Sequence, residues 1–179
     1  MKIGIIRYPG SNCDNDMLRY FQENDNEIFY IWHKTNILLK KIDLLIIPGG
    51  FAFGDRYYET ATSDYSITPG KMAIDSPVTS VILNAVEQKI PIFGVCNGFQ
   101  ILIKLNLLPG KLVLNNNNKF TCKNVNCILS SNYTKHNKDE QLYLQVANSY
   151  GNYKVEPDIL EKMKLNEQIV LKYDGKKII

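Results

Sequence analysis

The stretch Ile90-Pro-Ile-Phe-Gly-Val-Cys96-Asn-Gly-Phe-Gln100 decides how this chain is expected to fold. It begins with a short apolar run containing β-branched residues, which predicts a buried strand. It then turns through Gly94 and Gly98 and continues as an apolar segment with helical spacing. A cysteine between two glycines at such a strand–turn–helix junction is the thiol form of a nucleophile elbow, which holds a reactive side chain out of the sheet.

Cys96 is therefore the predicted nucleophile. The following helix would direct its N-terminal N–H groups and the positive end of its dipole at the sulfur, which lowers the pKa of a thiol and favours the thiolate. The alternative is that a cysteine is only a small buried hydrophobe. We prefer that alternative for Cys13, Cys122 and Cys127, which lack the elbow context.

Composition indicates an ordinary globular protein. The 179 residues are 45% hydrophobic and 22% charged, enough for one domain with a sizeable core. The net charge is +3 and the basic residues are dispersed, so no nucleic-acid partner is predicted. No apolar stretch approaches the length of a membrane span, so no membrane is predicted. No signal peptide is evident. The four cysteines lack disulfide-framework and zinc-ligand spacing, so they fit a reducing cytoplasm and no metal site is predicted.

The remaining sequence predicts an α/β fold, with a largely parallel central sheet flanked by helices and an added antiparallel hairpin region. Strands are expected at residues 2–7, 27–33 and 44–47, and helices at 14–23, 38–42 and 78–88, the last opened by Ser76-Pro77. Leu108-Pro-Gly110 is expected to end the elbow helix. Beyond it, we expect short strands at 111–114, 119–124, 125–129, 142–147 and 168–173, and a helix at 157–165. No repeat or linker divides the chain, so residues 1–179 are predicted to form a single domain.

A second candidate site element follows the strand at residues 44–47, in the sequence Pro48-Gly49-Gly50-Phe51. Two glycines at the carboxyl end of a parallel strand allow the backbone to approach a ligand closely, although a plain turn is an equally good interpretation. Cys96 also follows a strand, so both elements are expected at one crevice. When the thiolate attacks a carbonyl, the N–H groups of Gly50 or Phe51 and of Asn97 are predicted to hold the oxyanion.

A general acid–base partner is harder to find. The chain has two histidines, His33 and His136, and neither has an evident carboxylate to orient it. We therefore favour a structural or solvent-exposed role for each. The long irregular segment at residues 56–77 is predicted to cover the pocket or to contact a partner.

At this point the motifs resemble a known family. The segment from Gly94 to Gln100 is similar to the nucleophile motif of class I (triad) glutamine amidotransferases, which have a flavodoxin-like fold. Several segments resemble, more narrowly, the glutaminase subunit of phosphoribosylformylglycinamidine synthase. They include Tyr8-Pro-Gly-Ser-Asn-Cys-Asp14, Tyr30-Ile-Trp-His33, Pro48-Gly-Gly-Phe-Ala-Phe-Gly-Asp55 and Lys119-Phe-Thr-Cys122.

The resemblance implies a role in cytoplasmic purine biosynthesis. Glutamine would be hydrolysed to glutamate and ammonia. The ammonia would pass to a large synthetase subunit, often joined by a small bridging subunit, which uses ATP and magnesium to form the amidine. This chain would need no cofactor. Cys96 would form the glutamyl thioester, Gly49 and Gly50 would place the oxyanion-hole backbone, and Gly94 and Gln100 would shape the glutamine pocket.

Two departures from the family pattern affect the expected activity. The family completes its triad with His-Pro-Glu near the C-terminus, and this chain has no such sequence, so we expect the C-terminal end of the domain to be missing. Ala147-Asn148-Ser-Tyr150 stands where the family shows Ala-His-Gly-Glu. We therefore predict weak or no glutamine hydrolysis by this chain alone. The alternatives are a silent relative that only binds a partner, and an elbow-cysteine hydrolase that uses His33.

Overall fold

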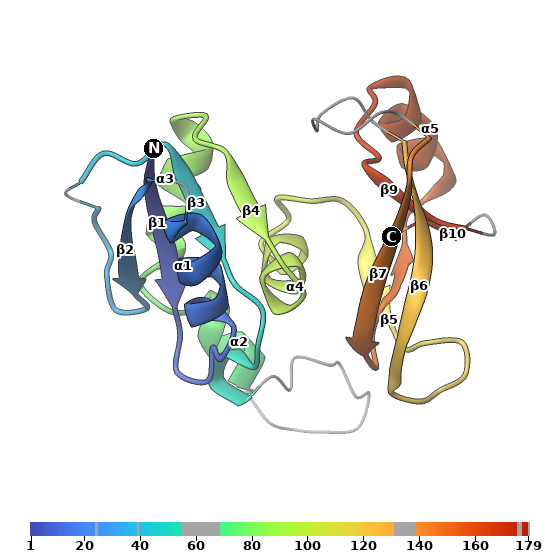
Figure 1. The fold of residues 1–179 in the computed structure, drawn as a ribbon, viewed down its shortest axis with the longest axis horizontal. Coiled ribbons are helices and arrows are strands. Elements are labelled where there is room, and N and C mark those ends of the chain that lie inside the picture. The colour runs from blue at the N-terminus through green and yellow to red at the C-terminus, as the bar shows by residue number, and fades with distance from the viewer. Residues whose placement is uncertain (24, 39, 55–68, 131–138, 175–176, 179) are drawn as a thin grey trace. The chain divides into compact units, whose positions relative to one another are not determined.

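The computed structural model describes residues 1–23, 25–38, 40–54, 69–130, 139–174 and 177–178. The chain forms two compact units, residues 1–108 and 109–179, which are described separately below (Figure 1). Most of the predicted loop at residues 56–77 lies outside the described residues, and so does His136. The prediction of a single domain spanning both units stays a prediction.

The first unit is built on a four-stranded parallel sheet with the order β2-β1-β3-β4. The strands are β1 (Lys2–Arg7), β2 (Glu27–Trp32), β3 (Leu44–Ile47) and β4 (Ile92–Gly94). Parallel pairing brings the carboxyl ends of all four strands to one edge of the sheet. The predicted parallel sheet is therefore confirmed, and the segments after β1, β3 and β4 meet at that edge.

Helices cover both faces of this sheet. On one face, Ile3, Ile5 and Ile46 pack with apolar side chains of α1 (Asp14–Gln22), which lies in front of the sheet in Figure 1. On the other face, Ile6, Leu45 and Ile47 pack with α3 (Thr79–Glu87) and α4 (Asn97–Lys104). Successive residues of a strand point to opposite faces, so a sheet covered on both sides needs the unbroken apolar runs that the sequence supplies.

An ion pair joins the end of β1 to the start of α1. The Arg7 guanidinium donates to the carboxylate of Asp14, which is only 1% exposed, and it also lies 4.2 Å from the centre of the Tyr30 ring. An acidic residue in the first turn of a helix also interacts favourably with the helix dipole. These contacts fix both ends of the loop at residues 8–13, which contributes to the site described below.

The second unit is mostly antiparallel. The strand β6 (Thr121–Leu129) pairs with β7 (Gln141–Asn148) and with β9 (Leu171–Tyr173), which in turn pairs with β10 (Lys177–Ile178). A separate ribbon joins β5 (Lys111–Val113) to β8 (Asn152–Lys154), and α5 (Pro157–Leu165) follows β8. The predicted hairpin region is confirmed, but the strands expected at 119–124 and 125–129 form one continuous strand.

Other local predictions need correction. The residues described between 38 and 42 are not helical: Ile42 is buried in the core instead, and so short a segment cannot offset the cost of nucleating a helix. A short helix, α2 (Pro69–Ile74), lies within the segment predicted to be irregular. The Ser76 hydroxyl donates to the Ala73 carbonyl rather than capping α3. Likewise, α4 ends at Lys104 with Asn106 in the left-handed region, several residues before Gly110.

Candidate active site

The elbow is built from the end of β4 and the start of α4. Cys96 has φ 51° and ψ −104°, precedes the first residue of α4, and is exposed. The Val95 N–H donates to the Ile47 carbonyl at 3.1 Å, and the Gly98 N–H donates to the Val95 carbonyl at 2.8 Å. A residue with a β-carbon in this conformation costs on the order of 1–3 kcal/mol, so the surrounding structure must hold it there. The predicted strand–turn–helix junction around the cysteine is therefore present. The prediction that its strand is buried is wrong, because β4 is the end strand of the described sheet and Phe93 is 49% exposed.

The glycines of the elbow let α4 pack closely against the sheet. A β-carbon at residue 98 would lie 2.0 Å from the Ile47 carbonyl oxygen, and one at residue 94 would lie 2.6 Å from a methyl carbon of Leu102. Position 98 therefore requires glycine, because the obstructing atom is backbone. At position 94 the nearest obstruction is a side-chain methyl group that can shift, and the Gly98 backbone lies 3.0 Å away. The role of Gly94 in shaping a glutamine pocket stays a prediction.

The loop after β3 lies directly beside the cysteine. A β-carbon at Gly49 would be 3.4 Å from the Cys96 β-carbon. Gly50 has φ 116°, and a β-carbon there would be 2.4 Å from the side-chain oxygen of Asn12. The two glycines and Cys96, which are separated by more than forty residues of sequence, thus meet at the carboxyl edge of the sheet, as their positions after neighbouring strands predicted.

Three successive amides of this loop have identified acceptors. The Phe51 N–H donates to the Gly10 carbonyl at 3.1 Å, and the Phe53 N–H donates to the Pro9 carbonyl. Between them, the Ala52 N–H donates to the side-chain oxygen of Asn97 at 3.2 Å. Within the described part of the chain, no hydrogen bond engages the Gly50 N–H. Of the two alternatives that the sequence left open for the oxyanion, the geometry favours Gly50 over Phe51.

Cys13 is a neighbour of the site that sequence reasoning missed. Its sulfur lies 3.7 Å from the position of a Gly49 β-carbon, and the side chain is half-buried rather than enclosed in the core. Burial raises the pKa of the Cys13 thiol, and the nearby carboxylates of Asp16 and Asp14 add to this effect. Its position just after β1 could have signalled this location, because β1 and β3 are adjacent in the sheet.

The other two cysteines differ from each other. Cys127 is fully buried, as predicted, between neighbouring strands on both sides. The prediction of burial is wrong for Cys122, which is exposed. Cys122 lies in the half of β6 that pairs with β7 alone, so it lacks the second neighbouring strand that shields Cys127.

His33 packs as a core residue would. Its ring lies 4.5 Å from the Trp32 ring and 5.1 Å from the Phe53 ring, measured between centres, and the residue is 9% exposed. The Nδ1 atom is buried, with no hydrogen-bond partner and no contacting carboxylate among the described residues. Burial lowers the His33 pKa, and Lys34 lowers it further. These features favour a neutral, structural histidine.

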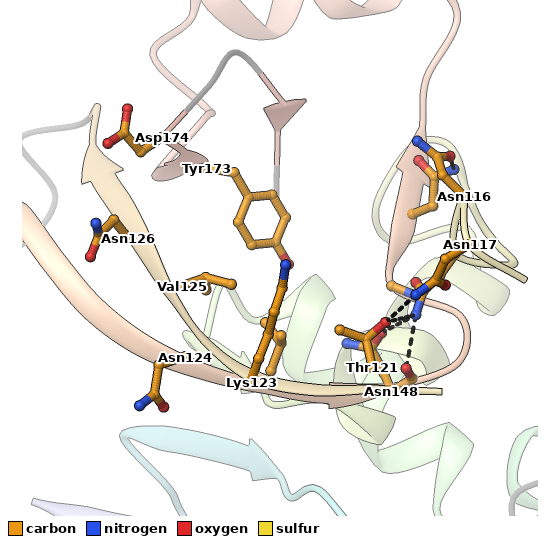
Figure 2. A pocket seen from close by; sticks show the side chains of 14 residues that line it. Asn116, Asn117, Thr121, Lys123, Asn124, Val125, Asn126, Asn148, Tyr173 and Asp174 are labelled. Atoms are coloured by element: carbon orange, nitrogen blue, oxygen red, sulfur yellow. Dashed lines mark hydrogen bonds between the residues drawn. The ribbon is translucent and has the colours of Figure 1, made fainter. Parts of the chain in front are cut away.

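In the second unit, Asn148 lines a cavity of about 550 Å³ (Figure 2). Asn148 is the residue that stands where the resembled family shows histidine. Its backbone carbonyl and its side-chain oxygen both accept from the Asn115 amide, at 2.9 and 3.2 Å. Asn117, Thr121 and Asn148 lie together at one end of the cavity (Figure 2). The side chain at position 148 thus belongs to a network of neutral amides and hydroxyls, which do not titrate near neutral pH and so cannot act as a general acid or base.

The part of the chain that the structure describes contains neither a cluster of metal ligands nor a membrane-spanning helix. In this part of the chain, no group of three histidine, cysteine, aspartate or glutamate side chains is placed to hold a metal ion. None of the helices described is long and apolar enough to cross a membrane.

Comparison with protein families identifies the chain. The model of the CobB/CobQ-like glutamine amidotransferase domain matches residues 1–178. The chain belongs to this amidotransferase family. The family-level resemblance drawn from the Cys96 motif is thereby confirmed, and both compact units fall within the matched region.

Solved structures agree with this assignment. The amidotransferase chain is similar to a chain in the structure of PurLQS from Thermotoga maritima, with 32% identity and a TM-score of 0.79, over 99% of this chain and 76% of that one. It also matches SMU.1228c (20% identity, TM-score 0.50, 88% of this chain and 64% of that one). A glutamine amidotransferase from Thermotoga maritima matches at 15% identity and a TM-score of 0.50, over 87% of this chain and 67% of that one. The last two likenesses show the fold alone.

Proposed function

We propose that this amidotransferase chain is the glutaminase subunit of a phosphoribosylformylglycinamidine synthase. The strained Cys96 elbow beside Gly49 and Gly50 is the main support. The likeness to a chain of PurLQS, over nearly the whole length of this chain, supports the choice of this amidotransferase over others. The substrate would be glutamine, and the ammonia would be used to convert formylglycinamide ribonucleotide to its amidine.

In the proposed reaction, the Cys96 thiolate attacks the side-chain carbonyl carbon of glutamine. The electron pair displaced onto oxygen is held by the N–H groups of Gly50 and Asn97. When the carbon–nitrogen bond breaks, the nitrogen takes up a proton and leaves as ammonia, and the glutamyl thioester stays on Cys96. Attack by water then releases glutamate and regenerates the thiol.

Partner subunits would carry out the ATP-dependent part of the reaction. A synthetase subunit, with or without a bridging subunit, would bind ATP and magnesium and would receive the ammonia, so this chain would need no cofactor of its own. The complex would work in the cytoplasm. We propose that the segment at residues 56–77 covers the pocket or contacts the synthetase.

A second candidate is a silent subunit that binds its partner without hydrolysing glutamine. It is favoured by Asn148, which lies in a hydrogen-bonded amide network where the resembled family has histidine, and by the packed His33 ring. Removing the base of a catalytic triad costs several orders of magnitude in rate. On this basis the isolated 179-residue chain is expected to release little glutamate.

The test is to measure glutamate release by the purified chain, alone and with the synthetase subunit from the same organism. Cys96→Ala serves as the matched control, since it removes only the sulfur. Release that requires Cys96, in either setting, supports the glutaminase function. Complex formation with no Cys96-dependent release supports the silent subunit. Failure to bind the synthetase would contradict both, and loss of activity in His33→Ala would favour the histidine-dependent hydrolase.

A further inference from the structure

The side chain of Asn97 connects the two halves of the candidate site. Asn97 is 6% exposed and is the first residue of α4, directly after Cys96. Its side-chain oxygen accepts from the N–H of Ala52, which is itself 1% exposed and lies 45 residues earlier in the sequence. Its amide nitrogen donates to the side-chain oxygen of Gln100 at 3.0 Å.

Among the described contacts of the loop after β3, the bond of the Ala52 N–H has a side chain as its acceptor, whereas the bonds on either side of it have backbone carbonyls. The carbonyls of Gly10 and Pro9 hold the amides on either side of Ala52, and both carbonyls belong to the loop after β1. These two carbonyls fix the loop after β3, at residues 48–54 and called the glycine loop below, relative to β1. Among the described hydrogen bonds, they do not contact the elbow. The bond from the Val95 N–H to the Ile47 carbonyl joins the end of β3 to the elbow, and the Asn97 side chain adds a link from the loop itself to the elbow helix.

The hydrogen bond between Asn97 and Ala52 affects the reaction because the two proposed oxyanion donors lie on different elements. Under the function proposed above, on which this inference rests, one donor is the Gly50 N–H of the glycine loop and the other is the Asn97 N–H of α4. A displacement of about 1 Å at a reacting group can cost on the order of a hundredfold in rate. The separation of these elements therefore needs a rigid connection, and a buried hydrogen bond provides one.

We propose that the Asn97 side chain is a positioning residue that sets the separation of the two oxyanion donors through its hydrogen bond to Ala52. Its second bond, to Gln100, orients the Asn97 amide so that the oxygen faces the Ala52 N–H. On this view the residue after the nucleophile acts through its side chain as well as through its backbone.

Three variants separate the two bonds. Asn97→Leu keeps the same branched arrangement of heavy atoms, although its methyl groups are bulkier, and it loses both bonds. Asn97→Asp keeps an acceptor for the Ala52 N–H and loses the donor to Gln100. Asn97→Ser is too short to reach Ala52 and replaces the leucine variant if that protein does not fold. The aspartate also adds a negative charge near the thiol, so the measurement must cancel changes in the thiolate fraction.

A ratio of two alkylation rates meets this need without requiring a general acid. A chloromethyl ketone analogue of glutamine, in which –CO–CH2Cl replaces the side-chain carboxamide, places its carbonyl at the oxyanion position. The Cys96 thiolate forms a carbon–sulfur bond with the chloromethyl carbon and chloride leaves. Iodoacetamide alkylates the same thiolate without using the donors. We expect Asn97→Leu to lower the ratio of chloroketone to iodoacetamide rates on the order of tenfold, and Asn97→Asp to keep it within about threefold of the wild type.

Several outcomes would overturn the inference. They are an unchanged ratio in Asn97→Leu, whether or not both rates fall together, and a fall in the ratio in Asn97→Asp as large as that in Asn97→Leu. If the wild type shows no preference for the chloroketone over iodoacetamide, the proposed function fails instead. In that case, hydrogen exchange at the Ala52 amide decides the positioning claim: faster exchange in Asn97→Leu than in Asn97→Asp supports it, and equal exchange overturns it.

Discussion

Four residues of one type, the cysteines, show how strongly environment decides chemistry. Cys96 lies at a strained elbow and is exposed, Cys122 is exposed on a strand, and Cys127 is enclosed in the core of the second unit. Burial raises the pKa of the Cys13 and Cys127 thiols. A thiol reacts as its thiolate, so a raised pKa means less reaction at a given pH.

These environments predict a pattern of alkylation. In the folded protein, iodoacetamide should modify Cys96 and Cys122 first, while Cys127 should react only after unfolding. The modification rate of Cys13 should rise with pH over a higher range than that of a thiol with an ordinary pKa, because its pKa is raised. Mass spectrometry of proteolytic peptides measures all four rates, with the urea-unfolded chain as the reference. Labelling of Cys127 in the native protein as fast as that of Cys122 would contradict this assignment.

At the scale of elements, the decisive contact is that of α4 with β3. The helix approaches so closely that Gly98 lies against the Ile47 carbonyl, whereas Gly49 has room for a methyl group. The two positions therefore have different roles. One allows the elements to pack, and the other keeps the space beside the nucleophile open.

Matched alanine substitutions separate these roles. Gly98→Ala should lower the free energy of unfolding by about 3 kcal/mol or more, because its β-carbon would meet backbone that cannot move aside. Gly49→Ala should leave stability nearly unchanged but slow the reaction of Cys96 with the chloroketone, since the methyl group would touch the cysteine side chain. Urea unfolding and alkylation rates measure the two effects. Equal stability losses in the two variants would show that this account of the packing is wrong.

At the scale of the whole molecule, the two compact units have cores of very different size. The first unit encloses a parallel sheet between helices, with most residues of β1 and β3 fully buried. Among the described residues of the second unit, the buried apolar side chains are those of Cys127, Leu129 and Ile169. Burial of apolar surface is the main source of stability, so the second unit should open more readily.

Hydrogen exchange tests this expectation. Amides of β1 and β3 should exchange slowest, and amides of β6 and β7 should exchange faster even though these strands are longer. Binding of the synthetase subunit should slow exchange in the second unit if it covers exposed side chains there, such as Phe120 and Tyr143. Equal protection of the two sheets in the isolated chain would contradict the difference in core size.

The sequence by itself determined the parallel sheet, the elbow and the family. Each of these follows from local patterns: apolar runs of strand length, glycines at fixed spacing around Cys96, and a motif that is contiguous in the chain. The positions of Gly49 and Gly50 at the same edge as Cys96 also followed, because parallel strands align their carboxyl ends. Short segments were less predictable, as the residues near Ile42 show, since burial of Ile42 in the core and the cost of nucleating so short a helix outweighed local helix propensity.

Only the tertiary structure decided which groups meet. No spacing in the sequence indicates that the Ala52 amide binds the Asn97 side chain or that the Phe51 amide is held by Gly10. These contacts join three loops that follow different strands, and their geometry depends on strand order and on how closely α4 packs. Local propensity fixes where a loop begins, whereas the packing of the elements on either side fixes what it contacts.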